Sequence, residues 1–357
     1  MEIKKEESRV DLDDKKLAEI VNQKKKDIII PLIIALILII ILIIVLIVVF
    51  TKKGKSGNNF KDNFEDTTEE NSEVKYEESN ELDTFSNEEL NKARESFKQF
   101  NFTNEDKSKF ILYNLFIPEN YQNEKYPLMV FIGDASLVGK ETTAPLNETI
   151  GGPIWATETE QKKHKSFVLV PEYSEVIIDD RDGYTITEYI ELTTKLITEI
   201  INTYNIDQNR IYGTGQSMGA MTTMYLLANR DIYAAGLIVD GQWKLDELEG
   251  LKNAVFTYFA AGGDEKAFNG QNEVKEFLSS QNIKYGQMIN IDAQEKVEIL
   301  NKNSTGMYNL GYKKNFITYI NGTVLRNSRS KSEHMASFKY GYRIDVVRDW
   351  IFDQKKN

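Results

Sequence analysis

The chain has 357 residues, a formal net charge of −11, no cysteine and only two histidines, His164 and His334. The absence of cysteine excludes disulfides, thiolate nucleophiles, iron–sulfur clusters and cysteine-based zinc sites, and two histidines exclude a histidine-rich metal centre. The acidic balance argues against nucleic acid as a partner, because phosphate binding needs clustered Lys and Arg, and no pattern in the sequence calls for a cofactor or a metal.

The N-terminal part of the chain predicts a membrane anchor. Residues 28–50 form a stretch of 23 residues without a charged side chain, mostly Ile, Leu and Val. As a helix rising 1.5 Å per residue, this stretch is about 34 Å long, enough to cross a bilayer core of about 30 Å. It is longer than the apolar core of a cleaved signal peptide and lacks a small-residue cleavage site, so we interpret it as an uncleaved signal anchor.

The charges on the two sides of this stretch predict its orientation. Eight Lys and Arg residues precede it and four follow closely, which places residues 1–27 in the cytoplasm and the rest of the chain outside. Residues 51–90 are acidic and poor in large apolar side chains, a composition typical of a disordered linker. Residues 1–88 contain 13 Lys and Arg against 19 Asp and Glu, so −6 of the net charge lies before the predicted folded domain.

Residues 91–357 alternate between strand-like and helix-like segments. This alternation predicts a single α/β domain with a mostly parallel sheet and helices on both faces. In chain order, the predicted strands are 110–116, 127–132, 167–170, 210–213, 237–239, 255–260, 316–320 and 323–325, the last two joined by a turn at 321–322. The predicted helices are 185–204, 218–229 and 342–352.

The sequence Gly215-Gln216-Ser217-Met218-Gly219 is a G-x-S-x-G motif placed between a predicted strand and a predicted helix. A nucleophile elbow requires this setting, because its turn is so tight that the residues two positions on either side of the serine must be nearly free of side chain. The serine hydroxyl then stands at a helix N-terminus, where developing negative charge is favoured. The motif makes Ser217 the candidate nucleophile, and a glycine-rich helix start without chemistry is the alternative.

A serine nucleophile needs a base and an acid. His334 follows the last predicted strands, which is the place expected from the chain order Ser, acid, His. His164 precedes Ser217 in a charged run and is expected to be an exposed loop residue. Asp264 follows one predicted strand through a pair of glycines, and Asp240 follows the strand before it, so we favour Asp264 as the acid and keep Asp240 as the alternative.

Two backbone N–H groups should bind the oxyanion that forms during acyl transfer. One is expected from Met218, and the other from the loop after strand 127–132, at Asp134 or Ala135. Trp155 and Trp243 either stack on the substrate in its pocket or pack in the core.

Two loops and one glutamate complete the predictions. Residues 136–165, which include Gly151-Gly152-Pro153, are expected to form a lid over the site. Residues 179–182 and the side chain of Glu333 are expected to be solvated.

Several segments of residues 98–355 resemble the α/β-hydrolase superfamily. They are PLMVFIGDAS (127–136), IWA (154–156), FVLVP (167–171), NRIY (209–212), GQSMG (215–219), GDEKA (263–267), EHM (333–335) and RDW (348–350). The branch they resemble most is the bacterial predicted peptidases and esterases, which are similar to polyhydroxybutyrate-depolymerase-type and feruloyl-esterase-type enzymes. The resemblance implies an eight-stranded sheet and a triad of Ser217, Asp264 and His334. Many relatives carry His-Gly in the oxyanion loop, where this chain has Gly133-Asp134.

The sequence therefore predicts a membrane-anchored, extracytoplasmic serine hydrolase. Its simplest activity is that of a carboxylesterase, which would form an acyl-enzyme from a small or polymer-linked ester. One alternative is a non-catalytic surface binding protein on a hydrolase scaffold, suggested by the Gly133-Asp134 difference. The other alternative is a serine peptidase.

Overall fold

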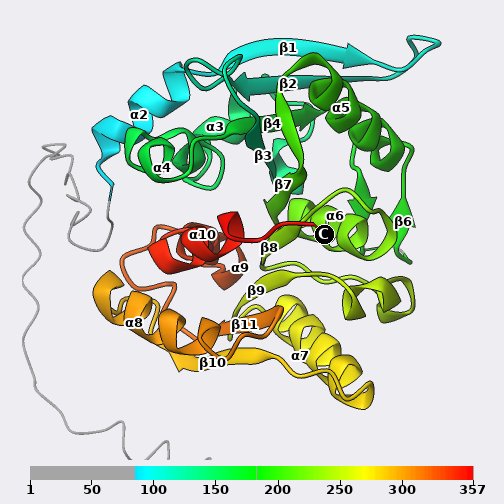
Figure 1. Cartoon of the computed structure of the whole chain (residues 1–357). Helices are drawn as coiled ribbons and strands as arrows, with labels where there is room; N and C mark the ends of the chain where they lie inside the picture. The colour runs from blue at the N-terminus through cyan, green and yellow to red at the C-terminus, as the bar shows by residue number, and fades with distance from the viewer. Residues whose placement is uncertain (1–84, 182, 357) are drawn as a thin grey trace, which may run out of the picture. The chain divides into compact units, whose positions relative to one another are not determined.

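The computed structural model describes residues 85–181 and 183–356 (Figure 1). The segment predicted to be cytoplasmic, the predicted anchor 28–50 and most of the predicted linker lie outside these residues. Within residues 85–181 and 183–356, no helix combines the length and the apolar character that a membrane crossing needs.

The folded domain begins earlier than residue 91. Helix α2 (Asn87–Glu95) covers the last residues of the predicted linker and buries Leu90. Its start is set locally, because the Ser86 side chain accepts a hydrogen bond from the Glu89 N–H at 3.1 Å. Acidic residues in its first turn also favour a helix start there.

A nine-stranded sheet lies at the centre of the part of the chain that the structure describes. Its strands are β1 (Lys98–Thr103), β2 (Phe110–Phe116), β3 (Tyr126–Ile132), β4 (Phe167–Tyr173), β7 (Ile206–Gln216), β8 (Ala235–Val239), β9 (Phe256–Ala261), β10 (Gly286–Ile291) and β11 (Lys314–Tyr319). The spatial order is β1-β2-β4-β3-β7-β8-β9-β11-β10. Strand β2 runs antiparallel to both of its neighbours, and every other neighbouring pair is parallel. The expected eight strands are corrected to nine: seven predicted strands are present, residues 323–325 are not a strand, and β1 and β10 are added at the two edges.

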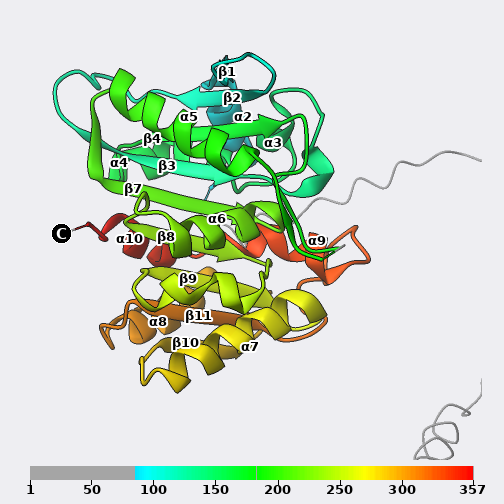
Figure 2. The same ribbon diagram turned by 90° about the vertical axis from the view of Figure 1, so that its right-hand side faces the viewer.

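Helices cover both faces of the sheet, as predicted (Figures 1 and 2). One face packs against α5 (Tyr189–Thr203), α6 (Met218–Asn229) and α7 (Glu265–Ser280), and the other against α2, α8 (Val297–Tyr308) and α10 (Asp345–Phe352). Strand β3 is buried on both sides, with Leu128 and Val130 in the first core and Met129 and Phe131 in the second. This alternation is the period of two that a strand imposes on a fully covered sheet.

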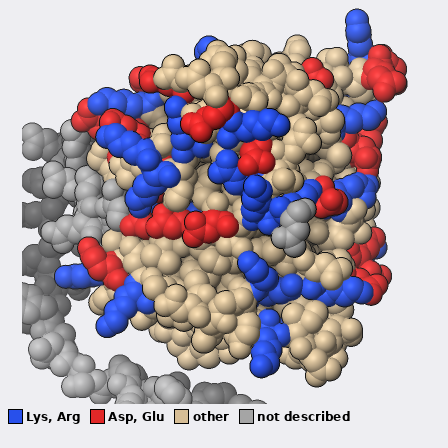
Figure 3. Space-filling view, viewed as in Figure 1, with Lys and Arg blue, Asp and Glu red and all other residues tan. Residues whose placement is uncertain are grey.

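Short elements complete the described chain. They are β5 (Ile178–Asp179), β6 (Thr185–Ile186), α3 (Ala144–Asn147), α4 (Glu158–Lys163), α9 (Glu333–Ser337) and the 3₁₀ turns η2 (Ala135–Leu137), η3 (Pro153–Ala156), η4 (Leu245–Glu247), η5 (Glu249–Lys252) and η6 (Phe338–Gly341). Basic and acidic side chains are interspersed over the face seen in Figure 3, which presents no broad basic surface of the kind that binds phosphate backbones.

Some predicted boundaries are wrong. The helix predicted from 185 begins at Tyr189, because the first two residues of that range pair with β5 as strand β6. Strand β4 continues through Pro171 to Tyr173. The residues predicted as strand 323–325 form turns instead of pairing with β11, because Gly322 adopts a positive φ of 84° and its N–H donates to the Glu333 side chain.

Candidate active site

Ser217 lies at the turn between β7 and α6, with φ 53° and ψ −116°. A residue other than glycine rarely adopts a positive φ, so the surrounding structure must hold the backbone of Ser217 in this conformation. The two motif glycines allow it. A Cβ added at Gly219 would lie 1.9 Å from the Ile132 carbonyl oxygen, and one added at Gly215 would lie 2.4 Å from the Gly219 carbonyl carbon. The motif therefore needs glycine at both positions, because the neighbouring backbone leaves no room for a side chain there.

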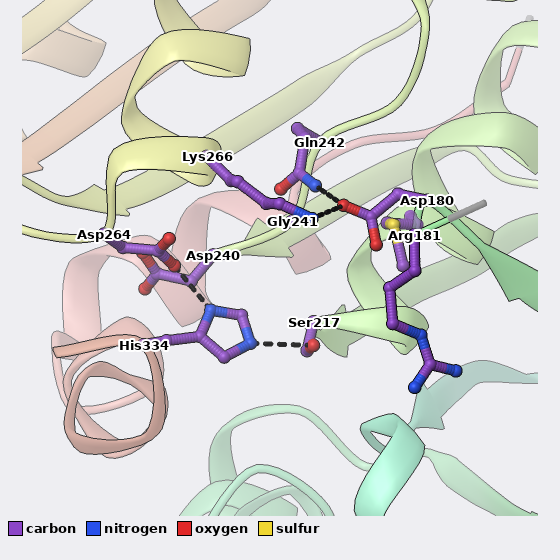
Figure 4. Close-up of a pocket in the computed structure, with 10 residues that line it drawn as sticks. Asp180, Arg181, Ser217, Asp240, Gly241, Gln242, Asp264, Lys266 and His334 are labelled. Atoms are coloured by element: carbon purple, nitrogen blue, oxygen red, sulfur yellow. Dashed lines mark hydrogen bonds and ion pairs between the residues drawn. The ribbon is translucent and has the colours of Figure 1, made fainter. Parts of the chain in front are cut away.

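The structure brings together the three residues predicted as a triad (Figure 4). His334 on α9 places Nε2 2.8 Å from Ser217 Oγ and Nδ1 2.5 Å from Asp264 Oδ2. Asp264 caps α7, and its other carboxylate oxygen accepts the Ala267 N–H at 3.3 Å, so this carboxylate is fixed in direction. Because an ionised carboxylate only accepts hydrogen bonds, Nδ1 carries the imidazole proton and Nε2 is left to accept the serine proton.

The charges around His334 favour its protonated form. Burial lowers the pKa of His334, but the hydrogen bond and negative charge of Asp264, with smaller contributions from Asp240 and Asp134, outweigh burial and raise it above 6.5. A base with a pKa closer to neutrality accepts a proton more readily, which suits proton transfer from serine.

Asp240, the alternative acid, lies behind the triad and does not replace Asp264. It is 1% exposed and adopts a φ of 46°, and its Oδ1 accepts the Ala261 N–H at 2.7 Å. Burial and the charge of Asp264 raise the pKa of Asp240 to about 7. The geometry therefore favours Asp264 as the partner of His334.

The residues expected to supply oxyanion donors lie around the nucleophile turn. Met218 is the first residue of α6, and Ala135 is the first residue of η2 after its cap Asp134. The first N–H groups of a helix have no partner within the helix, which leaves such groups available to a substrate oxygen. The added Cβ at Gly219 would also lie 2.8 Å from the Gly133 carbonyl oxygen, so the loop after β3 packs directly on the start of α6.

A cavity of about 350 Å³ opens on Ser217, His334 and Asp264. Its other lining residues are Asp180, Arg181, Met221, Asp240, Gly241, Gln242 and Lys266. Asp180 accepts hydrogen bonds from Lys266 Nζ at 2.7 Å and Gln242 Nε2 at 2.5 Å (Figure 4). In the loop 179–182, which was expected to be solvated, Arg181 is exposed and Asp180 is half-buried, and both line the pocket. Among the described residues, no group of three or more His, Asp or Glu is placed to hold a metal ion.

Of the two alternatives for Trp155 and Trp243, stacking in the pocket or packing in the core, the structure supports the core. Trp155 is completely buried, its Nε1 donates to the Gly151 carbonyl oxygen at 2.7 Å, and its ring contacts Tyr342. Trp243 is 2% exposed and donates to Glu247 at 2.7 Å.

The predicted lid and the predicted exposed histidine are also corrected. Gly151 packs so tightly on Phe131 and Tyr342 that an added Cβ would lie within 3.0 Å of both rings, so this part of 136–165 belongs to the core. His164 is partly buried, bonds Asp349 at 2.8 Å and stacks on Phe352. The imidazole that contacts Ser217 is that of His334, not that of His164.

Glu333 connects the loops that carry the acid and the base, and it is buried, not solvated as expected. Its carboxylate accepts the Gly263 N–H at 2.7 Å and also the Gly322 N–H. The first contact fixes the residue before Asp264, and the backbone of Glu333 itself leads into His334.

Glu333→Ala is expected to lower the free energy of unfolding by about 3 kcal/mol, because two backbone donors lose a charged acceptor in a buried setting. It is also expected to reduce turnover, because Asp264 and His334 lose their shared support. Chemical denaturation and ester kinetics measure both effects, with the exposed Glu265→Ala on α7 as the matched control. Equal stability of the two variants would contradict this role.

Comparison with known proteins places this arrangement in a structural class. No protein-family model and no curated protein matches the chain. Among solved structures, a thermostable esterase is similar at 23% identity and a TM-score of 0.55, over 74% of this chain but only 64% of that one. A variant of the feruloyl esterase module from Clostridium thermocellum, complexed with sinapinate, is similar at 14% identity and a TM-score of 0.51, over 76% of this chain and 93% of that one. With its sheet order and its serine at the turn after β7, the chain has the α/β-hydrolase fold.

Proposed function

We propose that the chain is a serine hydrolase that cleaves carboxylic esters through an acyl-enzyme. The observation that carries this proposal is the continuous chain of contacts from Ser217 Oγ through His334 to Asp264. This arrangement works against the alternative of a non-catalytic binding scaffold, because a binding protein has no need of a strained serine held against an imidazole. Two solved structures with similar folds are named as esterases, which supports the same reaction class.

The geometry supports a two-step reaction. His334 Nε2 takes the Ser217 proton while Oγ attacks the ester carbonyl carbon, and the N–H groups at Met218 and at the loop after β3 bind the oxyanion. Collapse of this intermediate expels the alcohol, which takes its proton from His334. Water then attacks the acyl-enzyme by the same route, and Asp264 stabilises the imidazolium in both steps.

The reaction class is tested by a panel of short acyl esters and matched peptide amides. We expect the esters to be hydrolysed much faster, because the cavity of about 350 Å³ is small, an ester carbonyl is less stabilised by resonance than an amide carbonyl, and an alkoxide is a better leaving group than an amide anion. Faster cleavage of the amides would favour the peptidase alternative. A folded protein that cleaves neither would favour the binding protein.

The acid limb of the pH profile of kcat/KM should follow the loss of a proton from His334. Only neutral imidazole accepts the serine proton, so kcat/KM should rise with pH through an apparent pKa above 6.5, which is the direction set by Asp264 and Asp240. Asp240→Asn should leave the part of this limb below pH 7 nearly in place, because the Asp240 carboxyl, with its pKa raised to about 7, is mostly neutral there. Ester kinetics between pH 5 and pH 8, an interval of about one to two units around the usual histidine pKa, measure the limb. A wild-type profile that is flat over this interval would contradict the assignment of the base.

We also propose that the enzyme is held at the cell membrane by residues 28–50, with the domain that begins near Ser86 outside. The support is the uncharged stretch of 23 residues and the excess of Lys and Arg before it. Protease added to intact cells should remove the hydrolase domain and its activity. A domain that stays protected until the cells are lysed would contradict the outside location.

A further inference from the structure

Two acidic side chains meet beside the nucleophile without belonging to the triad. Asp134 follows β3, Glu148 follows α3, and both contact Gln216, the residue before Ser217. The Gln216 amide nitrogen donates to Glu148 Oε2 at 2.8 Å and lies 3.5 Å from Asp134 Oδ2. Because one nitrogen reaches both carboxyl groups, the two groups lie side by side. Asp134 is 3% exposed, Gln216 is completely buried and Glu148 is half-buried, so the contact is only partly screened by water.

Two ionised carboxylates in contact repel each other strongly away from water, so such a pair shares a proton. Burial, a hydrogen bond to Asp134 and the charge of Asp134 raise the pKa of Glu148 to about 9. Burial also raises the pKa of Asp134, but hydrogen bonds with Glu148 and Ser136 outweigh it and bring this pKa below its usual value. At neutral pH, Glu148 therefore carries the proton and donates it in a hydrogen bond to the Asp134 carboxylate.

The pair ties two parts of the site together. Asp134 Oδ1 accepts the Ser136 N–H at 2.6 Å, which fixes the start of η2 in the loop expected to supply the second oxyanion donor. Gln216 also accepts a hydrogen bond from Thr149 Oγ1 at 3.1 Å. The groups that face the pair are the Ser136 N–H after β3, Thr149 after α3, Gln216 on β7, the His334 imidazole on α9 and the neutral phenol of Tyr342 after η6.

We propose that Glu148 is a positioning residue: as a protonated acid bonded to Asp134, it holds the oxyanion loop against the nucleophile turn, and its ionisation in alkaline solution loosens that loop and lowers turnover. One member of the pair, Asp134, belongs to the Gly133-Asp134 difference that suggested a non-catalytic scaffold. The kinetic part of the proposal rests on the proposed hydrolase function. The sharing of a proton between the carboxyl groups does not.

The kinetic test compares Glu148→Gln, Glu148→Ala and the control Glu141→Gln, an exposed glutamate earlier in the same segment. Glutamine can donate to Asp134 and accept from Gln216 but cannot ionise, so Glu148→Gln should keep wild-type kcat at pH 7 within a few-fold and lose the alkaline fall. Glu148→Ala should lower kcat at pH 7 by about 10- to 100-fold with little change in KM, because a misplaced donor weakens the transition state more than the ground state. Glu141→Gln should keep the wild-type alkaline fall. An alkaline fall that persists in Glu148→Gln, or full kcat in Glu148→Ala, would overturn the proposal.

A second measurement needs no catalysis, so it separates failure of this proposal from failure of the proposed function. The folded pKa of Glu148 lies above its unfolded value of 4.5, so its contribution to stability is complete below 4.5 and is lost as the pH rises toward about 9. The Tm of the wild type should therefore fall relative to that of Glu148→Gln as the pH rises over this range. Parallel Tm curves for the two proteins would overturn the shared proton, whatever the activity.

Discussion

Ser217→Ala is expected to lower kcat/KM for a short acyl ester by about 10⁴- to 10⁶-fold while the fold is retained. Without Oγ, the covalent acyl-enzyme cannot form, and only substrate binding and the oxyanion donors remain to assist direct attack by water. The β-carbon that stays meets no new contact, so thermal unfolding should change little. Hydrolysis of a chromogenic ester measures the loss, with Ser280→Ala on the exposed side of α7 as the control.

His334→Ala should cause a loss of similar size, and the double variant Ser217→Ala with His334→Ala should be little worse than either single variant. Residues that act as one unit in a single step give strongly non-additive losses. The 2.8 Å contact between Ser217 and His334 predicts such a unit. Losses that multiply in the double variant, or activity that survives Ser217→Ala, would contradict the assigned nucleophile.

Asp264→Asn is expected to lower kcat by about 10⁴-fold, because an amide in this place no longer fixes the Nδ1–H tautomer or stabilises the imidazolium. Asp240→Asn should lower kcat by less than about tenfold. Its carboxylate accepts the Ala261 N–H at 2.7 Å, which an asparagine oxygen also accepts, and His334 bonds Asp264 instead.

The pair of variants is matched, because both acids are buried, follow neighbouring strands and lie close to the same imidazole. Circular dichroism and Tm values identify any variant whose loss comes from unfolding. A larger kinetic loss in Asp240→Asn than in Asp264→Asn would reverse the assignment of the acid.

The nucleophile turn could be predicted from the sequence because its constraints are local. Gly215 and Gly219 are demanded by backbone contacts within a few residues of Ser217 and by the neighbouring strand β3. The α/β class was equally accessible, since β3 and β8 are apolar throughout and the helices between them carry apolar stripes. His334 followed from chain order and from the presence of only two histidines.

What the sequence left open depends on contacts between distant segments. Asp264 and Asp240 both follow strands, and only the direction of each side chain separates them. Glu148 meets Gln216 across 68 residues of sequence, and no motif marks either one as a partner.

The edge of the sheet was missed for a related reason. Strands β1 and β10 lie at the two borders of the sheet; β1 is mostly exposed and β10 alternates between buried and exposed residues, so neither has the apolar run of a central strand. Trp155 was ambiguous because an aromatic residue in a loop expected near the carboxyl edge of the sheet suits a pocket as well as a core, and its contact with Tyr342 comes from the far end of the chain.

The measurement that tests the central claim most directly is the reaction of the intact protein with a fluorophosphonate, followed by mass spectrometry of the intact chain and of its peptides. A serine activated by His334 should displace fluoride and retain one phosphonyl group, located on the peptide that contains Ser217. Ser217→Ala should remain unlabelled, and His334→Ala should react far more slowly. A folded wild-type protein that takes up no label, or carries it on another residue, would contradict the assignment of a serine hydrolase centred on Ser217.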